Sequence, residues 1–189
     1  MSGPESAIAL ASCPADIVEL AVFRERAVDL ERLAAGRNLT LPAAGALVAR
    51  SGRLTLSVRP GRWLLLTSPA PPGESAALWQ EASRGHGAVI DLSSALVVFL
   101  LSGPAVPEML ARACRLDLEA NAFPAGTAAA TIMVQVPAIL AQLTPGMLLL
   151  TPATTAQHLR EWLVETSQPF GLALAPDATV SELCAESST

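Results

Sequence analysis

The sequence has 189 residues, enough for one domain or two tightly fused half-modules, and 15% of them are charged against about 25% in an average soluble domain. The 12 basic residues are all arginines, scattered along a chain of net charge −5, which argues against a nucleic-acid-binding surface. The absence of lysine and tyrosine excludes a Schiff-base lysine, a phosphate-binding loop with its lysine, and a tyrosine general acid.

The first half of the sequence predicts strands and helices in alternation. Period-2 apolar patterns indicate strands, apolar residues at helical spacing indicate helices, and Pro60-Gly61 suits a tight turn within a hairpin. In chain order the predicted elements are a strand over 16–23, a helix from 26 to the stop at Gly36, a hairpin of strands 54–58 and 63–67, a helix over 74–84, buried strands over 88–91 and 95–101, and a helix beginning at 102–104.

The second half predicts three further strands and a closing helix. The strands are expected over residues 128–134, 138–143 and 147–150. The helix begins near Thr154 or Thr155, and Gln157 is placed for a capping box if Thr154 is the cap.

This order of elements predicts an α+β fold with helices packed on one side of mixed sheets. We expect a loose N-terminal arm over residues 1–14, a single domain over residues 15–175 and a mobile polar tail over residues 176–189. No basic region precedes the short apolar stretch at the N-terminus, so we expect no secretory signal and a cytoplasmic protein.

Residues 120–159 form a run of forty residues without a formal charge. Glutamines, prolines and a glycine interrupt the run, so it does not predict a membrane span. Such a segment is buried either in its own core, as in a well-packed apolar monomer, or against another protein. We favour a docking surface for a partner subunit, with the hairpin around Trp63 as a second candidate.

The residues able to carry chemistry do not form a recognisable motif. His86 and His158 have no carboxylate or thiol at the spacing of a catalytic triad. Asp91 precedes Ser93 at the end of a strand, without the G-x-S-x-G element of a nucleophilic serine. We therefore expect Asp91 to cap local backbone N–H groups, with ligand contact as the alternative.

The cysteines and the central arginines have ordinary structural explanations. Cys13, Cys114 and Cys184 are far apart and form no C-x-x-C or Cys/His set, so we expect buried free thiols and no zinc site. Arg112 and Arg115 are interpreted as a solvated helix end, or as a site for an anion or a partner carboxylate. We assign no catalytic, cofactor-binding or metal-ligating residue.

An ordered series of short elements resembles the gamma subunit family of heterotetrameric sarcosine oxidase. Members of that family carry W-L-L, D-x-S, L-S-G-P, C-x-L-D-L and F-P-x-G elements at similar spacing, and the resemblance spans roughly residues 17–170. The matching residues are Trp63-Leu64-Leu65-Leu66, Asp91-Leu92-Ser93, Leu101-Ser102-Gly103-Pro104, Leu110, Cys114-Arg115-Leu116-Asp117-Leu118, Ala122-Phe123-Pro124-Ala125-Gly126, Thr131 and Trp162-Leu163.

The resemblance implies an accessory subunit in a complex that oxidatively demethylates sarcosine. That family is similar to the folate-binding module of the glycine-cleavage aminomethyltransferase, or T-protein, and the resemblance implies the same fold. It places FAD, FMN, NAD and tetrahydrofolate, the one-carbon acceptor, on the large (alpha) and other subunits, with no cofactor on this chain. Two departures agree with a chain lacking catalytic groups. Ser94 stands where many relatives have His, and residues 134–140 carry no carboxylate where the T-protein has its aspartate-bearing G-G-x-x-D-D segment.

Two alternatives remain open at this stage. The first is a stand-alone folate-binding protein, although residues 113–117 fit the K-G-C-x-x-G-Q motif of such proteins poorly. The second is the equivalent subunit of a related amine oxidase or dehydrogenase, acting for example on N-methylglutamate or dimethylglycine.

Overall fold

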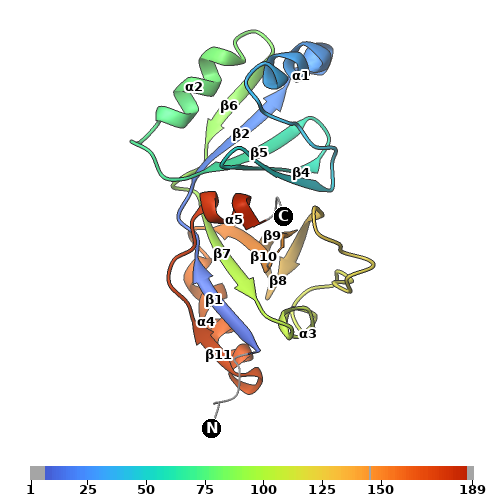
Figure 1. The fold of residues 1–189 in the computed structure, drawn as a ribbon, viewed down its shortest axis with the longest axis vertical. Coiled ribbons are helices and arrows are strands. Elements are labelled where there is room, and N and C mark those ends of the chain that lie inside the picture. Colours follow the sequence, from blue (N-terminus) through green and yellow to red (C-terminus); the bar gives the residue numbers. More distant parts are fainter. Residues whose placement is uncertain (1–6, 145, 187–189) are drawn as a thin grey trace.

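The computed structural model describes residues 7–144 and 146–186 and shows two β-sheets stacked along the long axis of the molecule (Figure 1). In the upper sheet the strand order is β3 (Ala46–Arg50), β4 (Arg53–Arg59), β5 (Arg62–Thr67), β2 (Asp16–Val22), β6 (Gly87–Asp91). In the lower sheet the order is β11 (Leu172–Leu174), β1 (Ile8–Ser12), β7 (Leu96–Ser102), β10 (Gly146–Pro152), β9 (Val136–Gln142), β8 (Ala128–Met133).

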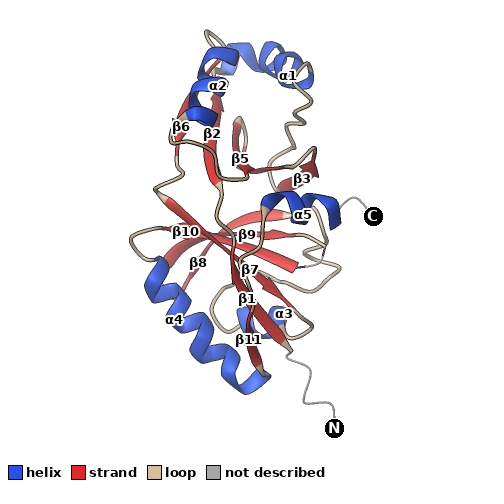
Figure 2. Cartoon of the chain, turned by 60° about the vertical axis from the view of Figure 1, so that its left-hand side comes forward, coloured by secondary structure: helices blue, strands red, loops and turns tan. Residues whose placement is uncertain are grey.

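Helices cover the outer face of each sheet (Figures 1 and 2). The upper sheet carries α1 (Ala27–Ala35) and α2 (Glu74–Ala82), and the lower sheet carries α3 (Val106–Leu110) and α4 (Ala156–Ser167). A fifth helix, α5 (Val180–Glu186), lies between the two sheets (Figure 1). Short 3-10 turns at Arg24–Arg26 and Gln168–Phe170 precede α1 and follow α4.

The predicted α+β class with mixed sheets is confirmed. Within the described residues the paired strands run antiparallel except for β1 and β11, which are parallel. Gly61 adopts φ +73 in the predicted hairpin turn, a conformation that glycine accepts without strain. Thr155, one of the two predicted start positions, precedes α4, and no side-chain cap hydrogen bond forms there. The condition for a capping box with Gln157, a cap at Thr154, is therefore not met.

The apolar core formed by the described residues has three parts. One lies between α1, α2 and the upper sheet, and another lies between α3, α4 and the lower sheet. The third lies between the sheets, where Ile17 and Leu54 from above meet Val98 and Leu148 from below. The lower sheet is therefore covered on both faces around β10, which is buried along nearly its whole length.

This sandwich corrects the expected docking role of the uncharged segment. Strand β10 and most of β9 face this chain's own core, so the charge-free sequence there reflects burial on both faces of the sheet. Only part of the segment stays at the surface, including β8, where Ile132 is 65% exposed. The docking interpretation is therefore wrong for the interior strands and stays open for the edge.

The predictions of a loose N-terminal arm and a mobile C-terminal tail are also wrong in part. Residues 8–12 were expected in a loose arm but form β1, which pairs with β7 and β11 and buries Ile8 and Leu10. Residues 180–186 were expected in a mobile tail but form α5, which packs Val180 into the core between the sheets. The rest of the expected arm and tail includes residues 1–6 and 187–189, which lie outside the described residues.

Candidate functional site

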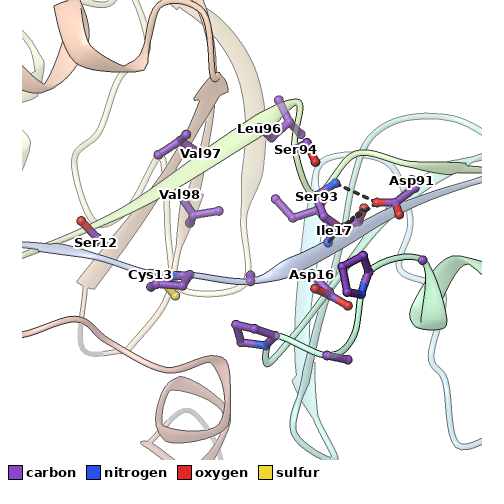
Figure 3. A pocket seen from close by; sticks show the side chains of 16 residues that line it. Ser12, Cys13, Asp16, Ile17, Asp91, Ser93, Ser94, Leu96, Val97 and Val98 are labelled. Atoms are coloured by element: carbon purple, nitrogen blue, oxygen red, sulfur yellow. Dashed lines mark hydrogen bonds between the residues drawn. The ribbon is translucent and has the colours of Figure 1, made fainter.

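The D-x-S element lies where the chain passes from the upper sheet to the lower one (Figure 3). The Ser93 hydroxyl donates to Asp91 Oδ1 at 2.7 Å, and the Ser93 backbone N–H donates to the same oxygen at 2.9 Å. These two bonds lower the pKa of Asp91 below the ordinary value of 3.8, the hydroxyl being the larger cause. The predicted capping role of Asp91 is therefore confirmed.

Ser93 also joins this crossing to the neighbouring one, in which β1 leads into β2. Its Oγ accepts the backbone N–H of Ile17 at 3.0 Å, and Leu92 N–H donates to the Ile17 carbonyl oxygen at 2.8 Å. A cleft of about 410 Å³ opens beside these residues, with Asp16, Asp91 and Cys13 among those lining it (Figure 3). Asp16 accepts a hydrogen bond from Ser75 Oγ at 2.9 Å. The two carboxylates that line the cleft, Asp16 and Asp91, are therefore already engaged in hydrogen bonds within the protein.

The two histidines lie in different layers of the molecule. His86 follows α2, 30% of its side chain is exposed, and its Nδ1 lies 3.9 Å from Asp29 Oδ2. His158 is exposed on the first turn of α4, the helix that covers the lower sheet. The structure therefore does not bring them together into an acid–base pair.

Cys13, Cys114 and Cys184 are buried and form no disulfide, as predicted. Burial raises the pKa of Cys13 from 9.0 to about 11, because a thiolate there would lose its hydration. Burial also raises the pKa of Cys184. Within residues 7–144 and 146–186, no three His, Cys, Asp or Glu side chains gather as a metal site would need.

A second hollow, of about 620 Å³, brings the two central arginines beside the uncharged segment. Arg112 and Arg115 follow α3, and Trp162 of α4 and Ile132 of β8 complete much of the wall. The Arg112 guanidinium lies 4.6 Å from the ring centre of Phe170 and 3.6 Å from Glu108 Oε1. The sequence suggested a site for an anion or a partner carboxylate at these arginines, but it gave no signal that β8 lies next to them.

Residues 134–140, which the resemblance sets against the aspartate-bearing segment of the T-protein, begin in a hairpin turn at the same hollow. Val134 and Gln135 join β8 to β9 with φ of +48 and +66, and both line the hollow. Positive φ is rare for a β-branched residue such as Val134 and costs about 1–3 kcal/mol. The turn therefore presents a strained backbone in place of acid–base groups.

No helix within the described chain combines the length and the apolar character that crossing a bilayer requires.

The fold defines an aminomethyltransferase-like α+β protein. It is similar to glycine cleavage system aminomethyltransferase T from Bartonella henselae, with a TM-score of 0.64, 16% identity and coverage of 90% of this chain and 48% of that chain. A chain of the heterotetrameric sarcosine oxidase from Corynebacterium sp. U-96, solved with pyrrole 2-carboxylate, matches with a TM-score of 0.78, 26% identity and coverage of 92% and 90%.

The profile of the sarcosine oxidase gamma subunit family matches residues 27–168, and the chain belongs to that family. It is 32% identical to sarcosine oxidase subunit gamma of Corynebacterium sp. strain P-1 over 135 residues, which cover 69% of this chain and 65% of that relative. It is 31% identical to the strain U-96 subunit over 147 residues, 75% of this chain and 70% of the relative. The match thus spans just under two-thirds of the strain P-1 protein. The family resemblance predicted from the short sequence elements is confirmed.

Proposed function

We propose that this chain is a non-catalytic accessory subunit of a heterotetrameric sarcosine oxidase-like complex that oxidatively demethylates sarcosine. The main support is its similarity, over 92% of its length, to a chain of a heterotetrameric sarcosine oxidase. In this proposal FAD, FMN, NAD and tetrahydrofolate lie on the large and other subunits, and tetrahydrofolate accepts the one-carbon unit. The complex works in the cytoplasm and involves no nucleic acid.

The chemistry of the described residues supports an accessory role. His86 and His158 lie in different layers of the molecule, Asp91 accepts hydrogen bonds from Ser93, and burial holds Cys13 in its neutral form. A catalytic subunit needs an acid, base or nucleophile aimed at a substrate in a common site. The contribution of this chain is therefore an assembly surface for the large subunit.

Co-expression tests this proposal. We expect a tagged large subunit of the same organism to retain this chain through affinity and size-exclusion chromatography, with an interface of more than about 2,000 Å² in total if it is obligate. Flavin absorbance should travel with the other subunits, and the isolated chain should be colourless and less soluble than in the complex. A soluble monomer that ignores the large subunit would contradict the proposal.

The fold similarity to aminomethyltransferase T supports one alternative, a stand-alone folate-binding protein. Calorimetry with a reduced folate and the isolated chain separates the two functions. The accessory role predicts no tight binding, whereas the alternative predicts a saturable heat with one site per chain. An equivalent subunit in a related N-methyl amine oxidase is distinguished by assaying the assembled complex with sarcosine, dimethylglycine and N-methylglutamate.

A further inference from the structure

Strand β8 leaves part of its outer edge without a neighbouring strand. At its start, Ala128 N–H donates to the Gly45 carbonyl oxygen at 2.9 Å, pointing away from β9. Alternate residues of an antiparallel strand direct their N–H and C=O groups to the same side. The backbone N–H and C=O groups of Ala130 and Ile132 therefore point away from β9, as those of Ala128 do. In the described chain, β9 is the only strand that pairs with these two residues.

This edge lacks the features that usually prevent a strand from pairing with another chain. Edge strands are commonly protected by charged side chains, prolines or bulges. Strand β8 has the sequence AAATIM, pairs with β9 in unbroken register over its whole length, and leaves Ile132 65% exposed. Its backbone is consequently suited to accept an added strand.

The other sheet edges fit this role less well. Strand β11 has only three residues, and strands β3 and β6 end in the charged residues Arg50 and Asp91. Strand β8 is the one edge strand of either sheet, within the described residues, that comes from the charge-free segment.

The charge beside β8 indicates what kind of segment would fit. Arg115 is exposed and, among the described residues, has no acidic partner within ion-pair distance. Arg112 shares the hollow, and its own acidic partner, Glu108, is an exposed residue one turn earlier. Two cations next to an uncharged edge, in a chain of net charge −5, complement a carboxylate carried by another molecule.

We propose that the large subunit adds an extended segment to the outer edge of β8 and places a carboxylate of that segment against Arg115. The segment would pair with the free backbone groups of Ala130 and Ile132, and the Ile132 side chain would be covered by it. This inference rests on the proposed function, because it names the surface by which this chain joins its complex. The strained turn at Val134 fixes the far end of the edge beside the arginines.

Four variants of the full chain test the surface in binding to the tagged large subunit. Ile132→Lys places a charge beside the added strand, where its neighbouring side chains would pack, and Val28→Lys is its control because Val28 is 66% exposed on α1. Arg115→Glu reverses the charge at the position proposed to hold the carboxylate, and Arg37→Glu is its control because Arg37 is exposed near the end of α1. Denaturation midpoints show that each variant is folded.

We expect Ile132→Lys and Arg115→Glu each to raise the dissociation constant about tenfold or more, and the two controls to stay within about twofold of wild type. Arg115→Glu should also reduce the salt dependence of binding, which a purely structural effect would not do.

The outcomes separate the two proposals. If wild type binds and both test variants bind equally well, the β8 surface is wrong and the accessory role stands. If wild type does not bind the large subunit, the accessory role itself fails, and the surface with it. If the isolated chain dimerises and Ile132→Lys abolishes only the dimer, the edge serves a second copy of this chain, which also overturns the inference.

Discussion

The Ser93 hydroxyl lies 3.0 Å from the backbone nitrogen of Ile17, and this contact ties together the two places where the chain crosses between the sheets. One crossing leads from β1 into β2, and the other leads from β6 into β7. Ser93 reaches both because it accepts the Ile17 N–H while it donates to Asp91. The D-x-S element of this family thus has a structural explanation in this chain.

Replacing Ser93 should loosen this junction. We expect Ser93→Ala to lower the free energy of unfolding by about 1–3 kcal/mol, because the N–H of the buried residue Ile17 loses its acceptor. Urea denaturation measures the change. Ser94→Ala is the matched control, since Ser94 is the next residue and is exposed. Equal losses for the two variants would contradict the role assigned to Ser93.

The L-S-G-P element should be intolerant of a side chain at Gly103. This residue has φ +115, and a Cβ there would lie 2.3 Å from the carbonyl oxygen of Ala7. Gly85 has φ +80 with nothing within 4 Å of such a Cβ, so Gly85→Ala isolates the backbone strain, about 1–2 kcal/mol. We expect Gly103→Ala to cost about 1–3 kcal/mol beyond that in urea denaturation. Similar midpoints for both variants would show that the close approach is absent.

Helix α5 should contribute to the stability of the whole fold. Leu183 is 2% exposed in the core between the sheets, so Leu183→Ala should cost about 2–5 kcal/mol through the cavity it leaves. Glu186→Ala, at an exposed position of the same helix, should stay within about 0.5 kcal/mol of wild type. Thermal and urea unfolding would measure both. A wild-type midpoint for Leu183→Ala would mean that the C-terminal residues are a tail after all.

The lowered pKa of Asp91 predicts a contribution to stability that depends on pH. Because the folded-state pKa lies below the unfolded value, this contribution is complete above the ordinary pKa of 3.8 and is lost as pH falls through the folded pKa. Asp91→Asn should therefore be less stable than wild type near neutral pH, and the difference should shrink in acid.

Urea denaturation midpoints measured at pH values from about 2.5 to about 7 test this prediction. Glu186→Gln controls for the loss of one negative charge at an exposed site outside the junction. A constant difference between Asp91→Asn and wild type across the whole range would show that ionised Asp91 does not stabilise the fold.

The C-terminal residues carry a local helix signal that the prediction of a tail leaves out. The tail expected after residue 176 contains Thr179 and Glu182 at the spacing of a capping box. In the structure Thr179 N–H donates to Glu182 Oε2 at 3.0 Å, and Glu182 N–H donates to Thr179 Oγ1 at 3.2 Å. The start of α5 was therefore readable from its sequence, although its docking site was not.

The exposure of β6 has no such local signal. The strand over 88–91 was predicted to be buried, but β6 is an edge strand with Ile90 46% exposed. The apolar composition of β6 is the same as that expected of a central strand. Only the strand order of the folded sheet shows that β6 lies at an edge. The same holds for Arg115 and Ile132, which share a hollow although they belong to different elements.

Apolar periodicity, turn residues and short motifs depend on neighbours in the chain, so they are sufficient to predict the α+β class, the positions of most strands and helices, and the family. Tertiary structure alone decided that β1 pairs with β7 and β11, that β10 is buried on both faces, and that β8 is left at an edge. These features depend on contacts between residues far apart in sequence. A charge-free strand has the same sequence pattern whether its own fold or a partner covers it.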